Sequence, residues 1–156
     1  MAASSTDHSV FLRTEGATDE LGQLLAGHLV PGDAVLLSGP IGAVKSHISR
    51  AIIRERLGRM EDVPSPSFTL VQTYDDPKGD IWHADLYRLS HPDDVLELGL
   101  EDAFETAICL VEWPDRLGPL TPKDAIMLSL LPDGDGRRAT FRFSGRDELA
   151  RALTDV

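Results

Sequence analysis

The sequence predicts an α/β fold in which a mainly parallel sheet is flanked by helices and ends in a β-hairpin. Two short, continuous apolar runs at residues 34–37 and 107–111 are typical of strands that are covered on both faces. Two further stretches, 18–29 and 48–57, carry apolar residues at helical spacing. Near the C-terminus, two strand-like segments flank the turn sequence Asp-Gly-Asp-Gly, which is typical of a hairpin. Strands that alternate with helices indicate a mixed α/β sheet.

Local signals set the expected bounds of these elements. Thr18 is a favourable N-cap, and Asp19 and Glu20 suit the positive first turn of a helix. Pro31 with Gly32 ends that helix, and Gly58 ends the next one. The expected order is strand 10–13, helix 18–29, strand 34–37, helix 48–57, strands 68–74 and 81–88, helix 91–104 broken near Gly99, strand 107–111, strands 125–131 and 138–143, and helix 146–153.

Length, composition and charge limit the classes of function. The 156 residues fit one domain over 1–156, in which we expect 1–9 to be a flexible N-terminus. We find no signal-peptide pattern and no apolar run near the ~20 residues of a membrane span. With one cysteine, Cys109, no intrachain disulfide can form, so we expect a cytoplasmic protein without a membrane partner. The net charge of −11 argues against strong direct nucleic-acid binding and favours a protein partner.

A phosphate-binding loop is predicted between the first buried strand and the second helix. In the P-loop pattern G-x-x-x-x-G-K-[ST], backbone amides cradle phosphates, the lysine reaches the β- and γ-phosphates, and the hydroxyl binds Mg²⁺. Gly39, Lys45 and Ser46 match this pattern, whereas Val44 stands at the second glycine position. The placement after an apolar strand and before a helix suits a P-loop. The same segment also fits an ordinary strand–loop–helix connection.

Val44 is the feature that threatens nucleotide binding. A glycine at this position lets the backbone approach the phosphates and adopt a positive φ. A β-branched residue in the left-handed region costs more than the ~1–2 kcal/mol that is usual there, and its methyl groups would compete for phosphate space. We therefore expect either a strained φ at Val44 or a loop that is remodelled to avoid strain.

Glu112 directly follows the second buried apolar run. Open α/β sheets bind ligands at the carboxyl ends of their strands, so we expect Glu112 to hold Mg²⁺ directly or through water. A solvated carboxylate at a strand end is the alternative.

Alternation along strand 81–88 puts His83, Asp85 and Tyr87 on one face, which suits either a site or a half-exposed strand. Two such residues are weak grounds for a transition-metal site.

The segment Ser65-Pro66-Ser67 lies between the loop and Glu112 in the sequence. P-loop switches commonly use a hydroxyl in such a segment to sense the γ-phosphate and Mg²⁺, although a plain Ser/Pro turn fits equally well. If it is a switch, we expect the segment to form part of a surface that docks a protein in a nucleotide-dependent way.

Together these segments resemble the TsaE family, the ATPase component of bacterial tRNA threonylcarbamoyladenosine synthesis. The family's pattern runs approximately G-x-L-G-A-G-K-T-T, S-P-T-[FY]-x-L-V, H-x-D-L-Y-R-L, E-L-G and I-C-L-V-E-W-P. This chain carries, in the same order, GPIGAVKSH, SPSFTLVQTY, HADLYRL, ELGLEDAF and ICLVEWPDRLG. The resemblance covers about residues 10–143, and HADLYRL with ICLVEWP is its most specific part.

The resemblance implies a P-loop NTPase-like fold and a protein that uses ATP and Mg²⁺. It implies partner proteins TsaB and TsaD, which transfer threonylcarbamoyl to adenosine in tRNA, while this chain hydrolyses ATP to reset their complex. The implied catalytic residues are Lys45, Asp85 and Glu112, and Ser46 and Glu112 match the Mg²⁺ positions. The residues implied to bind the nucleotide are Thr18, Gly39, Pro40, Ile41, Gly42, Ala43, Val44, Lys45, Ser46, His47, Ser67 and Arg137, with Thr18 and Arg137 beside the adenine.

Three positions depart from the family pattern and keep other functions open. Val44 replaces a glycine, Ser67 replaces a threonine but keeps the hydroxyl, and His47 replaces the second hydroxyl of the loop. Val44 would suit a nucleotide-impaired module that docks on the same partners. A small-molecule P-loop kinase is a further alternative, but it would need an acceptor region and an arginine-bearing lid, and the sequence has no clear insertion for either.

Overall fold

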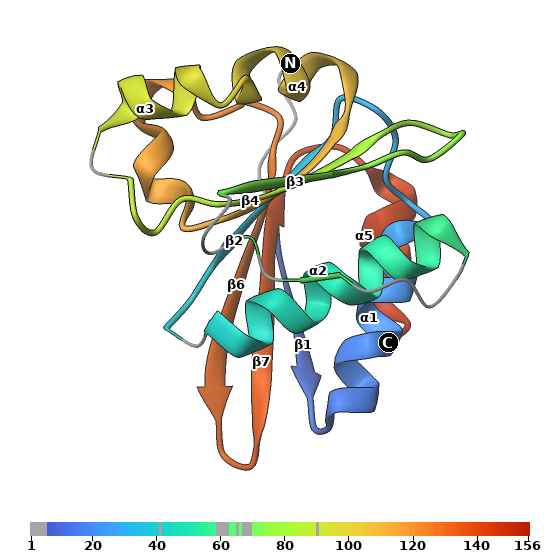
Figure 1. Cartoon of the computed structure of the whole chain (residues 1–156). Coiled ribbons are helices and arrows are strands. Elements are labelled where there is room, and N and C mark those ends of the chain that lie inside the picture. Colours follow the sequence, from blue (N-terminus) through green and yellow to red (C-terminus); the bar gives the residue numbers. More distant parts are fainter. Residues whose placement is uncertain (1–5, 41, 59–62, 65, 67–69, 90) are drawn as a thin grey trace.

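The computed structural model describes residues 6–40, 42–58, 63–64, 66, 70–89 and 91–156 (Figure 1). In these residues seven strands form one sheet in the order β1-β7-β6-β2-β5-β4-β3. The bounds of the strands are β1 Thr6–Leu12, β2 Ala34–Ser38, β3 Val71–Tyr74, β4 Ile81–Asp85, β5 Ile108–Glu112, β6 Ile126–Asp133 and β7 Gly136–Phe143.

The centre of the sheet is parallel and its two edges are antiparallel. Strands β6, β2, β5 and β4 pair in parallel, whereas β1 with β7, β7 with β6, and β4 with β3 pair antiparallel. At one edge of the sheet, β7 forms a hairpin with β6 and also pairs with the edge strand β1, in both cases antiparallel. The expected α/β fold with a parallel sheet and a C-terminal hairpin is confirmed, with the parallel pairing confined to the four central strands.

Helices cover both faces of this sheet, as Figure 1 shows. The helices are α1 Glu15–Ala26, α2 Gly42–Leu57, α3 Pro92–Glu97, α4 Leu100–Thr106 and α5 Asp147–Thr154, with a 3₁₀ segment η1 at Pro114–Leu120. One buried apolar cluster joins the sheet to α1, α2 and α5, and another joins it to α3, α4 and η1. In the described part of the chain, none of these helices has the length and apolar character that a membrane crossing requires.

The central strand β5 follows the sequence prediction closely. Ile108 and Leu110 point into the cluster beneath α1 and α2, whereas Cys109 and Val111 point into the cluster beneath α3 and α4. A continuous apolar run is needed here because both faces of the strand are buried. The helical segment after β4 also breaks as expected, because Gly99 adopts a φ of 81° between α3 and α4.

The N-terminal bounds differ from the prediction. Thr18 is not an N-cap: α1 begins at Glu15, and the Thr14 hydroxyl oxygen accepts a hydrogen bond from the Ala17 N–H at 3.1 Å. Thr14 has the same capping chemistry four residues earlier, and Thr18 is buried in the second turn. Strand β1 begins at Thr6, so residues 6–9, which we expected to be flexible, pair with β7. An ion pair of 2.9 Å from Arg142 Nε to Asp7 Oδ1 accompanies this pairing.

Strand β4 is shorter than predicted and ends at Asp85. The Asp85 carboxylate oxygen Oδ1 accepts a hydrogen bond from the Tyr87 N–H at 3.0 Å, which turns the chain out of the sheet. Tyr87 is therefore half exposed against the Trp113 ring, with 4.8 Å between ring centroids. The expected polar face of three residues is reduced to His83 and Asp85. Residues 68–69 of the expected preceding strand lie outside the described residues.

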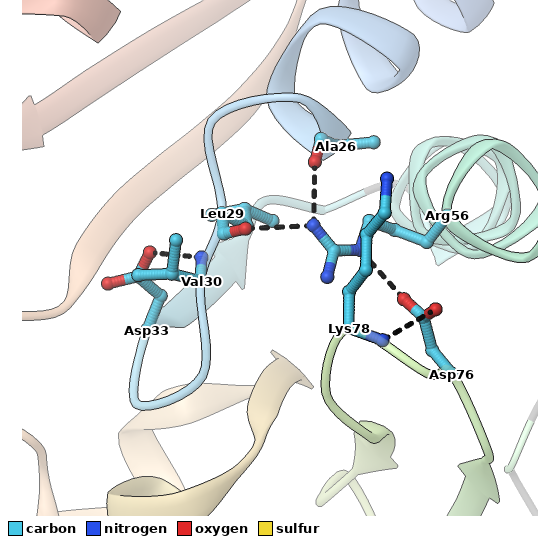
Figure 2. Close-up of polar contacts among 7 residues, drawn as sticks. All are labelled: Ala26, Leu29, Val30, Asp33, Arg56, Asp76 and Lys78. Carbon is cyan, nitrogen blue, oxygen red and sulfur yellow. Dashed lines mark hydrogen bonds and ion pairs between the residues drawn. The ribbon is translucent and has the colours of Figure 1, made fainter.

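A buried ion pair ties the far end of α2 to the rest of the molecule (Figure 2). Arg56 Nε donates to Asp76 Oδ2 at 3.1 Å, in the turn between β3 and β4. Arg56 Nη1 also donates to the carbonyl oxygens of Ala26 and Leu29, at 3.2 and 2.9 Å, where α1 has just ended. The Ala26 carbonyl, one of those that a helix terminus leaves without partners, is thus bound by a cation, as is the Leu29 carbonyl in the loop that follows.

Candidate nucleotide-binding site

The candidate site lies where three parallel strands end side by side. Strand β2 ends at Ser38, β4 at Asp85 and β5 at Glu112. The sheet register pairs Asp85 with Glu112 and Leu37 with Glu112, so the carboxyl ends of the strands meet at one edge. Helix α2 begins at Gly42, a few residues after β2, and directs its N-terminus to the same edge. This is the position at which open α/β sheets bind ligands.

The loop between β2 and α2 requires a glycine at its first position. Gly39 has a φ of 134°, and a Cβ atom there would collide with the carbonyl oxygen of Leu130 on β6. Pro40 is exposed, and Ile41 lies outside the described residues. Gly42 and Ala43 open the first turn of α2. Their helical position puts backbone N–H groups at the positive end of the helix dipole, where anions are stabilised.

Val44 is accommodated without the strained φ that we considered. Outside the glycines, the described residues with a positive φ are Leu70, Trp113 and Arg146, so Val44 is not among them. Its side chain is nearly buried and packs in the same apolar cluster as Leu12 and Ile48. The helix begins before Val44, so a left-handed conformation is not needed at this position.

Ser46 and Glu112 come together as the sequence predicts. The Ser46 hydroxyl donates to Glu112 Oε2 at 3.5 Å, although 66 residues separate the two in the sequence. A hydroxyl and a carboxylate are hard oxygen donors that suit Mg²⁺. In the residues that the structure describes, no group of three or more His, Cys, Asp and Glu side chains is arranged to hold a metal. A Mg²⁺ ion here would therefore depend on water and phosphate oxygens for its other ligands.

Lys45 is a buried cation without a hydrogen-bond partner among the described residues. Its Nζ lies 3.9 Å from the centre of the Trp113 ring, which gives a cation–π contact. Burial lowers the pKa of Lys45 below its ordinary value, and three carboxylates act in the opposite direction. Those carboxylates belong to Glu112, Asp85 and Asp115. Among the described residues this buried ammonium group has no oxygen acceptor, so its hydrogen-bonding capacity is unused there.

Asp85 lies beside this cluster at the end of β4. Its side chain is buried, and it contributes to the electrostatic field at Lys45. The backbone N–H of Asp85 donates to the carbonyl oxygen of Leu70 at 2.9 Å, and the Leu70 N–H donates to the Pro66 carbonyl oxygen at 2.7 Å. These bonds connect Asp85 to the segment after α2. Ser67, which we expected at the site, lies outside the described residues.

A cavity of about 390 Å³ is lined by residues from the end of β1, from α1 and α2, and from the β6–β7 hairpin. It brings together four residues that the resemblance implied: Thr18, Val44, His47 and Arg137. At its rim, His47 Nε2 lies 2.7 Å from Asp19 Oδ1, which links α2 to α1.

The same cavity contains residues that sequence reasoning missed. They are Leu12, Arg13, Thr14, Glu15, Arg50 and Asp135. Arg50 follows His47 by three positions, so helical periodicity had offered a signal for it. For Arg13, Asp135 and the others, no spacing rule relates the end of β1 or the hairpin turn to α2.

Comparisons with known proteins identify similar sequences and a similar fold. A family model described as Threonylcarbamoyl adenosine biosynthesis protein TsaE matches residues 12–140. A protein named tRNA threonylcarbamoyladenosine biosynthesis protein TsaE from Rickettsia felis is 39% identical over 121 residues, which are 78% of this chain and 71% of that protein. The protein of the same name from Bacillus subtilis is 32% identical over 142 residues, covering 86% and 88% of the two chains. The crystal structure of YdiB from B. subtilis has the same fold, with a TM-score of 0.79 over 97% of each chain at 24% identity.

Proposed function

Because the chain belongs to the TsaE family, we propose that it binds and hydrolyses ATP with Mg²⁺ and serves in tRNA threonylcarbamoyladenosine biosynthesis. It does so as a single cytoplasmic domain that acts on the TsaB and TsaD proteins. The observation that carries the ATP proposal is Lys45, a buried cation that has no oxygen partner in the described residues and lies in the first turn of α2. The oxygens of a bound phosphate would give this ammonium group its hydrogen-bond acceptors.

Each part of the nucleotide has residues that suit it. The backbone amides at the start of α2 and the Lys45 ammonium would bind the β- and γ-phosphates. Ser46 and Glu112 would hold Mg²⁺, which when bound neutralises phosphate charge. The cavity lined by Thr18 and Arg137 would take the adenosine end. Because Val44 adopts helical backbone and packs in the core, it supports ATP binding over the nucleotide-impaired alternative.

We assign the hydrolytic step to Asp85 as the residue that orients the attacking water. Its carboxylate is buried at the strand end next to Glu112, and the Tyr87 N–H fixes one of its oxygens. A residue with this role acts mainly on the transition state. Asp85→Asn should therefore lower turnover strongly and leave ATP affinity nearly unchanged. Equal losses of turnover and affinity would contradict the assignment.

Calorimetric titration of ATP and ADP, in Mg²⁺ and in EDTA, tests the nucleotide proposal. We expect saturable binding whose affinity depends on Mg²⁺. Absence of binding for both nucleotides would show that the chain has lost this activity, and tight binding to TsaB–TsaD in that case would favour the impaired docking module.

The partner proposal needs a separate measurement. The net charge of −11 disfavours RNA phosphates as the direct contact and supports a protein partner. Titration of purified TsaB–TsaD with this chain should give different affinities with an ATP analogue and with ADP. By linkage, the partners should shift nucleotide affinity by the same factor. Direct tRNA binding by the isolated chain at physiological salt would contradict the charge argument.

A further inference from the structure

His83 is a buried histidine of β4 that the proposed function leaves without a role. Its side chain is about 1% exposed, and Nε2 lies 2.8 Å from Glu112 Oε2 on the neighbouring strand β5. A carboxylate that serves a cation is ionised and can only accept hydrogen bonds, so in that role of Glu112 the contact requires the ring proton on Nε2. The other ring nitrogen, Nδ1, is buried and has no partner in the described part of the chain.

Two side chains of the described residues contact the Glu112 carboxylate, and both reach the same oxygen. His83 Nε2 lies 2.8 Å from Oε2, and the Ser46 hydroxyl donates to the same oxygen at 3.5 Å. Oε1 accepts no hydrogen bond from the residues that the structure describes. One oxygen is thus held from β4 and α2, which restricts rotation of the carboxylate, while the other keeps its capacity to bind a cation or water.

The histidine is placed to orient Glu112 rather than to bind a metal itself. Mg²⁺ prefers oxygen ligands, and the described residues contain no cluster of three metal-binding side chains. An apolar residue would fill the same buried position without leaving a ring nitrogen unsatisfied. The feature that an apolar residue cannot supply is the hydrogen bond from Nε2 to Glu112.

We propose that His83 is a positioning residue for the magnesium site: it holds Glu112 through Oε2 so that Oε1 is directed to the metal or its water ligands. The inference rests on the proposed function, because it assumes that Glu112 serves a bound cation. Partners that orient metal-binding side chains typically contribute 10–100-fold to metal affinity or activity.

Mn²⁺ titration of the protein–ADP complex, followed by electron paramagnetic resonance, tests the proposal without relying on turnover. His83→Leu, which removes the donor, should raise the half-saturating Mn²⁺ concentration about 10-fold or more. His83→Gln, which carries an N–H donor at a similar reach, should recover most of the wild-type value. ADP affinity in EDTA should be the same in all three proteins, because His83 is assigned no contact with the nucleotide.

His8→Leu is the matched control. His8 lies on β1 at the far edge of the sheet, stacks on Phe143 at 5.2 Å, and also has a buried ring nitrogen without a partner among the described residues. This variant removes an equally buried nitrogen and should leave the Mn²⁺ titration unchanged.

The outcomes separate this inference from the proposed function. A wild-type chain that binds no ADP, or that binds ADP without binding Mn²⁺, overturns the proposed function and the inference together. A wild-type chain that binds both, with an unchanged titration for His83→Leu, overturns only the inference. A folded His83→Gln that is as weak as His83→Leu would show that the hydrogen bond is not the relevant contribution. Imidazole ¹⁵N spectra that place the proton of His83 on Nδ1 alone would also overturn it.

Discussion

Helix α2 carries a buried cation at each end, and the two have very different surroundings. At the C-terminal end, Arg56 donates to the Asp76 carboxylate and to two backbone carbonyls (Figure 2). The other oxygen of Asp76 accepts from the Lys78 N–H at 3.2 Å. At the N-terminal end, Lys45 is fully buried but has an aromatic face as its neighbour and no hydrogen-bond partner in the described residues.

The difference separates a stabilising cluster from a candidate binding site. Buried polar groups in native proteins are nearly always hydrogen-bonded, and for Lys45, which lies next to Ser46 at the start of α2 and near Glu112, a bound phosphate would supply the missing partner. Arg56 and Asp76 satisfy one another and hold α1, α2 and the β3–β4 turn together. In the proposed function, Lys45 keeps its hydrogen-bonding capacity for a ligand, at a cost to the stability of the free protein. If the proposed function holds, the same helix contributes to stability at one end and to nucleotide binding at the other.

The largest expected effect is on stability, at the Arg56 end. Arg56→Ala leaves the Asp76 carboxylate buried without its cation, and removal of one partner from a buried pair typically costs about 3–5 kcal/mol. Urea unfolding should show this loss in the free energy of unfolding. Arg142→Ala, which removes the exposed ion pair with Asp7, is the control and should leave the urea midpoint almost unchanged. A similar urea midpoint for both variants would show that the buried cluster does not stabilise the fold more than the exposed ion pair does.

The next effect is on binding, at the Lys45 end. Lys45→Met keeps a long side chain of similar shape and removes the charge. We expect ATP affinity to fall by about 100-fold, since a hydrogen-bonded charge pair with phosphate contributes roughly 2–3 kcal/mol. The free energy of unfolding at neutral pH should stay equal or rise, because the buried charge is gone. A large loss of stability with unchanged ATP affinity would reverse the assigned roles of the two cations.

A substitution at Val44 shows whether this side chain acts on ATP binding or on the packing of the core. Val44→Gly removes a buried side chain and places glycine in a helix, so we expect about 2 kcal/mol of destabilisation. ATP affinity should change by less than about threefold (under 1 kcal/mol), because the valine already adopts helical backbone. Calorimetric titration of both proteins measures the change. A gain of tenfold or more in the glycine variant would show that the valine obstructs the phosphates.

Elements that depend on the residue pattern within one short segment were predictable from the sequence. The run at β5 and the loop after β2 follow from apolar patterning and from the position of Lys45 and Ser46. The meeting of Ser46 with Glu112 was also predictable, because both follow parallel strands and such strands end at one edge. These features require only that the strands be neighbours.

Features that depend on register or on distant packing were not predictable. The contact from His83 to Glu112 requires that β4 and β5 be adjacent and in one particular register, across 29 residues of sequence. The pair of Arg56 with Asp76 gives no signal in the sequence, because a helix end and a turn meet only in the folded chain. The cap at α1 was misplaced for a related reason. Thr14 and Thr18 have the same chemistry, and burial of Thr18 beside the core decides between them.

The smallest expected effect is a pH dependence that distinguishes the two ends of α2. Burial lowers the pKa of Lys45, so at neutral pH the folded chain holds a proton that the fold disfavours. The unfolded chain retains this proton up to the ordinary value near 10.5, and it therefore binds more protons than the folded chain between the lowered pKa and 10.5. In this window the free energy of unfolding gains a positive contribution as the pH rises.

The Lys45→Met protein has no such contribution, so its stability advantage over the wild type should be greatest at neutral pH and should shrink as the pH approaches 10.5. Urea unfolding of both proteins at several pH values measures the difference, with Arg56→Ala as the comparison, since arginine stays protonated over this range. An advantage that is constant with pH would show that Lys45 titrates normally, and that its environment is not the unsatisfied one that sets this end of α2 apart.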